Sequence, residues 1–289
     1  MNACQICPRG CRVDRENSLG YCRAPSEFLV SRVALHPFEE PCLCGESGSG
    51  TVFFGGCNLG CVYCQNSAIS RGQKGEKMTE AELEKAIFSL VEMGASNVNF
   101  VTPTHYTLAL ASLLERIKPR LPVPVVWNCG GYESVDALHA LDGLVDIYLP
   151  DFKYHSPALA EKYSHAPDYP EVASAALLEM FRQRGGVKFD RERQLKSGVL
   201  VRHLVLPTHR KDSMDVLRTL ADLLPISDIR LSLMSQYTPD FVDKTAYPEL
   251  SRRVTSFEYS SVLDLALSLG FEGYFQSRES AKKDYTPDF

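Results

Sequence analysis

Three cysteines that follow a short apolar run constrain the fold of this 289-residue chain more than any other feature. They are spaced as Cys57-x3-Cys61-x2-Cys64. Thiolates are the usual ligands of iron–sulfur clusters, so this spacing can hold three irons of a 4Fe–4S cluster. The fourth iron then keeps an open position where a small molecule can bind. The preceding run Thr51–Phe54 is β-branched and aromatic, so we expect the cysteine loop to follow the C-terminal end of a buried strand.

An aromatic residue precedes the last cysteine, and the whole motif Cys57-x3-Cys61-x-Tyr63-Cys64 resembles the signature of the radical S-adenosylmethionine (SAM) superfamily. The pair Gln65-Asn66 is similar to that of the activases of glycyl radical enzymes. The stretch 39–59 resembles uncharacterised iron–sulfur proteins that are similar to the pyruvate formate-lyase activating enzyme. This resemblance extends over most of the chain.

The resemblance implies two cofactors, a 4Fe–4S cluster and SAM, and an electron donor such as a flavodoxin or ferredoxin. It also implies the reaction. An electron from the cluster cleaves SAM into methionine and a 5′-deoxyadenosyl radical, which takes a hydrogen atom from a substrate. The cofactors carry this difficult step, and the protein positions the reactants and excludes water.

Composition narrows the choice of partners. The formal net charge of −5 gives no support for a nucleic-acid partner. No run approaches the roughly 18 apolar residues of a membrane helix, and the N-terminus lacks the pattern of a signal peptide, so we expect a cytoplasmic protein without a membrane partner. In a reducing compartment, the ten cysteines indicate metal ligands rather than disulfides.

A second group of cysteines lies near the N-terminus as Cys4-x2-Cys7-x3-Cys11, followed by Cys22. This segment has few apolar residues and many turn residues, so a metal is expected to stabilise it. Four thiolates suit either a structural zinc or a second iron–sulfur cluster, and ligand softness does not separate the two. Four unligated cysteines are the alternative. We assign residues 1–50 to a small cysteine-rich metal-binding segment and a linker.

Cys42 and Cys44 lie in that linker with one residue between them. This spacing is too short for a comfortable shared position beside the main cluster. We interpret the two cysteines as structural, with supplementary ligation or a redox role as alternatives.

From residue 78 the sequence predicts alternating helices and strands. Thr79 and Glu82 form a capping box before an apolar repeat, which indicates the start of a helix. Further helices are predicted at 108–117, 134–141, 157–163, 170–184, 214–224 and 259–269, and strands at 97–101, 123–127, 144–149, 199–206, 229–234 and 271–275. Counting the strand before the cysteine loop gives six strand–helix units, fewer than the eight of a closed barrel.

We therefore predict an α/β fold, a partial (β/α)6 TIM-like barrel, over residues 51–277, with a tail at 278–289. Radical SAM proteins that resemble this chain have such a fold. Functional groups gather at the C-terminal ends of parallel strands, which directs attention to the residues there.

The second predicted strand is followed by Thr102-Pro103-Thr104-His105-Tyr106. Activases usually carry a Gly-Gly-Glu phrase here, which receives the amino group of SAM. We expect the hydroxyls of Thr102 and Thr104 to substitute for it, and His105 to face SAM or the substrate. A purely structural turn is the alternative.

Later strand ends supply further polar groups. Asn128 is placed to offer its amide to the sugar of SAM or to the substrate, whereas Cys129 is interpreted as a small buried residue. The phrase Asp151-x-Lys153 is similar to one in the activases, and a charged pair beside a buried strand is costly unless it is paired or used.

Three more residues complete the predicted cofactor site. Arg202 suits a two-point contact with the SAM carboxylate. Tyr63 is expected to contact the adenine, and Asn66 is assigned to the cofactor through the activase-like pair. The candidate catalytic residues are His105, Asp151 and Lys153.

Three functions remain open from the sequence. The first is an activase that generates a glycyl radical on a partner enzyme. The second is a radical SAM enzyme that acts on a small molecule or another peptide. The third is an electron-transfer protein with two clusters, although such carriers need no barrel-sized scaffold.

Overall fold

The computed structural model describes residues 4–71 and 74–276, in which seven parallel strands form one curved sheet. Their order across the sheet is β10-β9-β8-β6-β5-β4-β2. The strands are β2 (Ser49–Phe54), β4 (Val98–Val101), β5 (Val125–Cys129), β6 (Ile147–Pro150), β8 (Leu195–Leu204), β9 (Arg230–Met234) and β10 (Gly273–Phe275).

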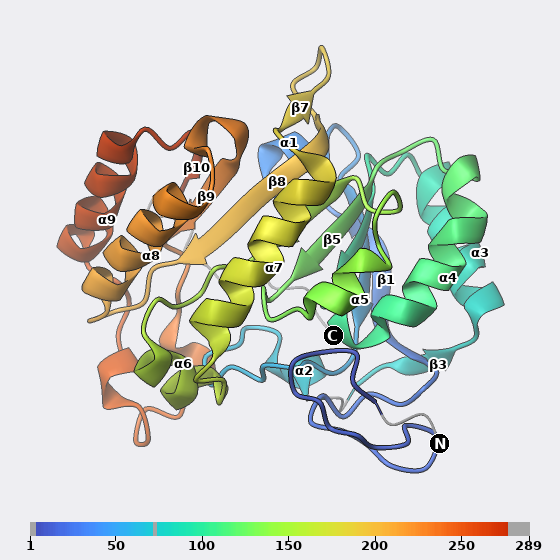
Figure 1. Cartoon of the computed structure of the whole chain (residues 1–289), viewed down its shortest axis with the longest axis horizontal. Coiled ribbons are helices and arrows are strands. Elements are labelled where there is room, and N and C mark those ends of the chain that lie inside the picture. The colour runs from blue at the N-terminus through green and yellow to red at the C-terminus, as the bar shows by residue number, and fades with distance from the viewer. Residues whose placement is uncertain (1–3, 72–73, 277–289) are drawn as a thin grey trace.

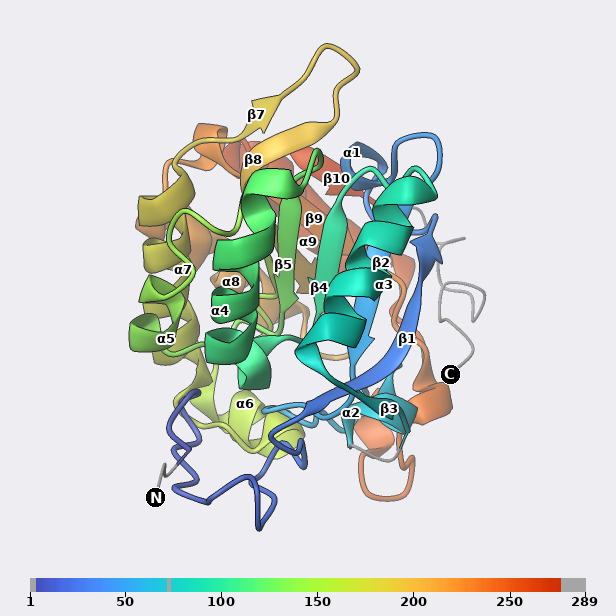
Figure 2. The ribbon, with the colours of Figure 1, turned by 90° about the vertical axis from the view of Figure 1, so that its right-hand side faces the viewer.

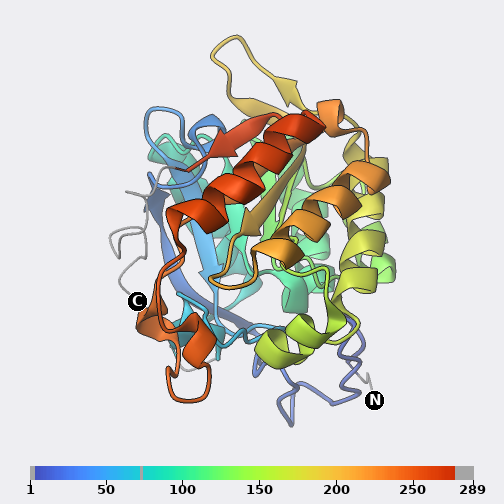
Figure 3. The ribbon, with the colours of Figure 1, turned by 90° about the vertical axis from the view of Figure 1, so that its left-hand side faces the viewer.

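Helices connect these strands and lie around the outside of the sheet, as the three views in Figures 1, 2 and 3 show together. The six predicted strand–helix units of an open, partial barrel are confirmed. The helices are α3 (Glu80–Glu92), α4 (Thr107–Ile117), α5 (Val135–His139), α6 (Pro157–Ser164), α7 (Tyr169–Arg184), α8 (Arg210–Leu223) and α9 (Ser256–Leu269). The predicted capping box forms, because Thr79 Oγ1 accepts a hydrogen bond from Glu82 N while the Glu82 carboxylate accepts from Thr79 N.

Three strands were not predicted. β1 (Phe28–His36) pairs antiparallel with β2, β3 (Glu76–Met78) pairs antiparallel with β1, and β7 (Lys188–Phe189) pairs with β8. The linker predicted before residue 50 is therefore partly a strand, which continues the sheet beyond β2. Most of β1 is only half-buried, so its sequence lacks a strong apolar alternation. The predicted tail, 278–289, lies outside the described residues.

The two ends of the sheet carry different segments. α1 (Pro41–Cys44) and β7 lie at the end where the parallel strands begin, whereas α2 (Ser67–Ser70) and the N-terminal segment lie where they end (Figure 1). Short 3-10 turns occur at Thr104–Tyr106, Lys118–Arg120, Ile226–Asp228, Pro239–Phe241 and Pro248–Leu250. Among the described residues, no helix is both long and apolar enough to cross a membrane.

Candidate functional site

The carboxyl ends of neighbouring strands lie at one level, and backbone hydrogen bonds fix this register. Thr102 N donates to Asn128 O at 2.8 Å, and Asp151 N donates to Cys129 O at 2.9 Å. Asp151 also forms a parallel bridge with Arg202 on β8. The polar residues predicted at four strand ends are thereby brought side by side.

A cavity of about 340 Å³ opens at this level, and we call it the main cavity. Its wall includes residues from several of the parallel strands and from the cysteine loop after β2. Ten of the predicted site residues line it: Cys57, Cys61, Tyr63, Cys64, Asn66, Thr102, Asn128, Asp151, Lys153 and Arg202.

Two of the residues predicted to face SAM or the substrate do not line the main cavity. Thr104 is buried, and its hydroxyl donates to Glu133 Oε1 at 2.6 Å. His105 is buried as well, with Nε2 2.9 Å from Gly55 O, and it faces the N-terminal cysteines instead. The chain turns into a 3-10 helix directly after Pro103, which directs both side chains away from the main cavity. The placement predicted for Thr104 and His105 beside SAM is therefore corrected.

The three cysteine thiols line the main cavity together, so they suit a cluster that needs one thiolate on each of three irons. Leu59 N donates to Cys57 Sγ at 3.4 Å, and Ser164 Oγ donates to Cys61 Sγ at 2.9 Å. Such donors stabilise thiolates. Burial raises the pKa of the Cys64 thiol to about 12, a cost that ligation by a metal offsets. Among the described residues, no group of three or more His, Cys, Asp or Glu side chains is arranged so that it could hold a single metal ion, and this applies to the loop cysteines and to the N-terminal cysteines alike.

A chain of hydroxyl groups ends on Cys61. Tyr63 OH lies 2.6 Å from Tyr154 OH, which lies 2.8 Å from Ser164 Oγ. Because Ser164 donates to Cys61 Sγ, Tyr154 donates to Ser164 and Tyr63 to Tyr154. The sequence analysis did not identify Tyr154 or Ser164, which are separated from Cys61 by about a hundred residues.

Replacing Ser164 by alanine removes the donor to Cys61 Sγ. We expect the reduction potential of a cluster held by the loop cysteines to become more negative by roughly 20–60 mV, the equivalent of one hydrogen bond for a one-electron couple. A redox titration followed by electron paramagnetic resonance (EPR) measures this change. Ser174→Ala, which removes a hydroxyl bonded only to Pro170 O on α7, is the control and should leave the potential unchanged. An unchanged potential in Ser164→Ala would show that this contact does not tune the cluster.

Asp151 and Lys153 form an ion pair at the wall of the main cavity, with Lys153 Nζ 2.5 Å from Asp151 Oδ2. Burial disfavours the charged form of Lys153, but the Asp151 carboxylate, together with Cys61 and Tyr169, outweighs burial and holds the pKa of Lys153 well above its usual value. The ammonium group is therefore charged at neutral pH and available to an anionic part of a ligand.

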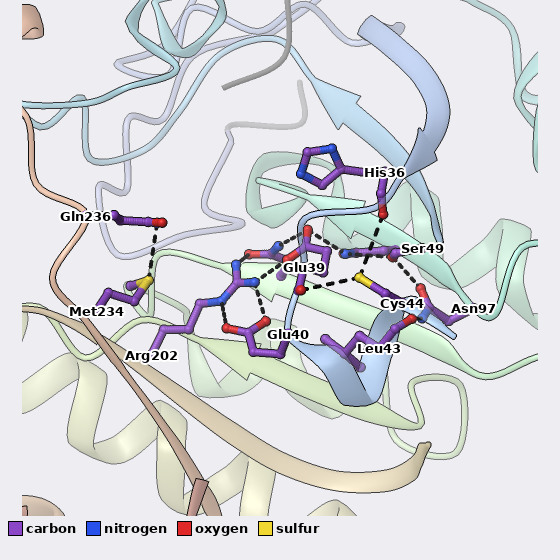
Figure 4. A network of polar contacts seen from close by, with 12 residues as sticks. His36, Glu39, Glu40, Leu43, Cys44, Ser49, Asn97, Arg202, Met234 and Gln236 are labelled. Carbon is purple, nitrogen blue, oxygen red and sulfur yellow. Dashed lines mark hydrogen bonds and ion pairs between the residues drawn. The ribbon is translucent and has the colours of Figure 1, made fainter. Parts of the chain in front are cut away.

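Arg202 enters a network that the sequence analysis did not predict (Figure 4). Its guanidinium bonds both oxygens of Glu40, from Nε at 2.7 Å and from Nη2 at 2.5 Å, and also bonds Glu39. Both carboxylates come from the loop between β1 and α1. The contact predicted between Arg202 and SAM stays a prediction, because the structure shows this arginine engaged with two glutamates.

Glu39 also accepts hydrogen bonds from the Asn99 amide at 3.1 Å and the Asn128 amide at 3.5 Å. The charged residues that line the main cavity are Glu39, Glu40, Asp151, Lys153 and Arg202, so carboxylates outnumber cations by one. The sequence motif Glu39-Glu40-Pro41 contains both carboxylates. It lies far in sequence from the strand ends that predicted the cavity, so its contact with Arg202 was not predicted.

Of the seven remaining cysteines, Cys129 lines the main cavity with the three on the loop, and the other six do not. Cys4, Cys7, Cys11 and Cys22 line a second, small cavity together with His105. Cys42 is 2% exposed in a local apolar core, in agreement with a structural interpretation, and Cys44 Sγ donates to Glu39 O at 3.3 Å. Cys129 is buried beside Glu133, whose pKa burial raises to about 7. None of the ten cysteines, all within the described residues, forms a disulfide.

The chain matches one family model and is similar to a protein of known sequence. Residues 51–221 match the family model of the radical SAM superfamily, a range that includes the three loop cysteines and most of the barrel. An uncharacterised protein of Methanocaldococcus jannaschii is 32% identical over 274 residues, which cover 91% of this chain and 74% of the relative.

Two solved structures are similar at lower identity. The radical SAM methyltransferase TsrM from Kitasatospora setae, determined with cobalamin and a 4Fe–4S cluster, is 14% identical with a TM-score of 0.46. The match covers 64% of this chain and 34% of that one. Methylornithine synthase (PylB) is 15% identical with a TM-score of 0.48, and the match covers 73% of this chain and 59% of that one.

Proposed function

This chain belongs to the radical SAM superfamily, and from that membership we propose that it cleaves SAM at its main cavity and abstracts a hydrogen atom from a substrate. A 4Fe–4S cluster and SAM, when bound, supply a 5′-deoxyadenosyl radical. The observation that supports this function is the convergence of Cys57, Cys61 and Cys64 with a row of polar strand-end residues on one cavity.

The residues of the main cavity divide into three groups in this proposal. Cys57, Cys61 and Cys64 hold the cluster. Lys153, kept charged by Asp151, and Asn128 bind polar groups of SAM at the strand ends. Tyr63 offers its ring to the adenine, because its hydroxyl is already directed to Tyr154.

Glu39 is proposed to compensate for the missing Gly-Gly-Glu phrase. The main cavity carries one more carboxylate than cation, and SAM has a net positive charge from its sulfonium and ammonium groups. An excess buried carboxylate is costly unless a cation pairs with it. Glu39, which shares Arg202 with Glu40, is therefore the carboxylate most suited to the ammonium group of SAM.

Anaerobic reconstitution with iron and sulfide tests this function directly. With SAM and dithionite, the protein is expected to form 5′-deoxyadenosine and methionine in equal amounts, measured by liquid chromatography and mass spectrometry. The control without dithionite should form neither, because cleavage needs an electron. A protein that assembles a reducible 4Fe–4S cluster and still leaves SAM intact would contradict the proposal.

The substrate is proposed to be a glycyl radical enzyme, so that the protein acts as an activase with a flavodoxin or ferredoxin as electron donor. Asn66 and the Asp151–Lys153 pair, which resemble activase residues, all line the main cavity and support this choice. The altered sequence after β4 instead favours a small molecule or another peptide. An EPR doublet from a glycyl radical, formed when candidate partner enzymes are added, would support the activase; turnover of a small molecule alone would support the alternative.

We also propose that Cys4, Cys7, Cys11 and Cys22 hold a second metal centre, either zinc or an iron–sulfur cluster. The four thiols line one cavity, and the surrounding segment, residues 4–25, contains neither a helix nor a strand. Tyr21 N donates to Cys11 Sγ at 3.3 Å, as expected of a thiolate ligand.

A further inference from the structure

We infer that the N-terminal cysteine site is a brace for the catalytic loop: a metal bound by Cys4, Cys7, Cys11 and Cys22 fixes residues 55–59, which include Cys57 and precede Cys61 and Cys64. The inference rests on the proposed function only for the role of the braced loop. Three direct contacts between the two segments and a fourth contact through His105 support it.

The first contact is between the two sets of cysteines. Cys57 N donates to Cys22 O at 3.2 Å, so a cysteine of one set is joined to a cysteine of the other through the backbone. Gly56 has a φ of +89°, and a Cβ there would lie 2.5 Å from Cys22 O. Only glycine permits this approach of the two backbones. Metal ligation by Cys22 therefore fixes the position of Cys57 directly.

The second and third contacts hold the next two residues. Tyr21, the neighbour of Cys22, donates from its hydroxyl to Leu59 O at 3.0 Å. Arg9, which lies between Cys7 and Cys11, donates from Nε to Asn58 O at 2.7 Å, and its guanidinium stacks on the Tyr21 ring at 3.9 Å. Arg9 and Tyr21 each lie within two residues of a cysteine that lines the N-terminal cavity, so ligation of that cysteine would restrain them.

Arg9 also connects the brace to the end of α6, because Nη2 donates to Ser164 O at 2.9 Å. Ser164 is the residue whose hydroxyl donates to Cys61 Sγ. The N-terminal site thus fixes both the loop that carries the ligands and the donor to one of them.

The fourth contact passes through His105. This histidine lines the N-terminal cavity and is 2% exposed, its Nδ1 has no hydrogen-bond partner, and its Nε2 lies 2.9 Å from Gly55 O. Arg15, which also lines the cavity, donates to His105 O. A metal centre in this cavity would therefore lie beside the histidine that contacts Gly55 at the start of the loop.

Metal content of the full-length protein tests the site. In a variant with Cys57, Cys61 and Cys64 all replaced by alanine, anaerobically reconstituted with iron, sulfide and zinc, we expect retained metal. One zinc per chain identifies a single ion, iron with equal sulfide identifies a cluster, and either supports the site. A chain with neither metal would overturn the inference. Since this variant lacks the SAM-cleaving cluster by construction, the result is independent of the proposed function.

Hydrogen–deuterium exchange of the metal-loaded protein tests the brace. In Cys7→Ala/Cys11→Ala, we expect amides of residues 55–62 to exchange at least about tenfold faster, because the contacts of Tyr21 and Arg9 loosen, while α7 keeps its protection. Cys44→Ser, which retains a donor to Glu39 O, is the matched control and should exchange as the wild type does. Unchanged exchange of residues 55–62 in the double variant would overturn the brace.

If the double variant does not fold, a milder substitution tests the same brace. Tyr21→Phe removes only the hydroxyl that bonds Leu59 O. We expect about threefold faster exchange in residues 57–62 with the N-terminal metal retained, and wild-type exchange there would count against the brace.

Discussion

Cys61→Ala is expected to abolish formation of 5′-deoxyadenosine, leaving no more product than the reaction without dithionite. The substitution removes one of the three thiolates that line the main cavity, and it also removes the acceptor for the hydroxyl chain from Tyr63 through Ser164. Chromatographic measurement of 5′-deoxyadenosine after reaction with SAM and dithionite gives the result, and iron and sulfide content show whether a cluster assembles.

Cys44→Ser is the control for a general effect of losing a thiol. Cys44 lies at the other end of the sheet, and serine keeps a donor to Glu39 O, so this variant should form 5′-deoxyadenosine at a rate close to that of the wild type. Intact turnover in Cys61→Ala would contradict the assignment of the loop as the site of SAM cleavage. Equal losses in both variants would indicate damage that is not specific to the cluster.

Arg202→Met is expected to lower the free energy of unfolding by about 3–5 kcal/mol at neutral pH, because it leaves two buried carboxylates without their shared cation. The side chains of Glu39 and Glu40 are each 7% exposed. Equilibrium unfolding in urea measures the loss. Arg230→Met is the matched control: its partner Glu272 is 68% exposed, so at most about 1 kcal/mol should be lost.

The pH dependence of Arg202→Met separates electrostatics from packing. Burial raises the pKa of Glu40, but Arg202 outweighs burial and holds that pKa below its usual value. This pair therefore stabilises the wild type above the unfolded pKa of about 4.3, and the contribution is lost as the pH falls through the folded pKa. Without Arg202, burial favours the protonated carboxyl, so the deficit of the variant should shrink from pH 7 to pH 5. A deficit that is independent of pH would indicate lost packing instead.

Local signals in the sequence predicted most of the fold. The capping box at Thr79 and the apolar repeat after it depend on residues within one or two helical turns, and the structure confirms the helix they predict. The alternation of helices and apolar strands likewise predicted a parallel, open barrel. β1 was missed because it is a half-buried antiparallel strand beside β2, without the continuous apolar pattern of the parallel strands.

The sequence predicted the part of the site that lies at the C-terminal ends of the parallel strands. Asn128, Asp151 and Arg202 line one cavity because parallel strands end at one edge of a sheet. Predicting the strands was therefore enough to predict that these residues lie together. Thr104 and His105 were misplaced because the direction of a side chain after a strand end depends on the turn that follows, here a 3-10 helix.

The sequence by itself thus determined the chemistry of the cysteine loop and the type of barrel behind it, because both depend on spacing within short segments. Only the tertiary structure decided what surrounds that chemistry. Glu39 reaches Arg202 across more than 160 residues, and Ser164 reaches Cys61 across about a hundred. Cys22 joins the backbone of Cys57 from outside the barrel. Such contacts depend on how distant segments pack in three dimensions, and one sequence carries no periodic signal for them.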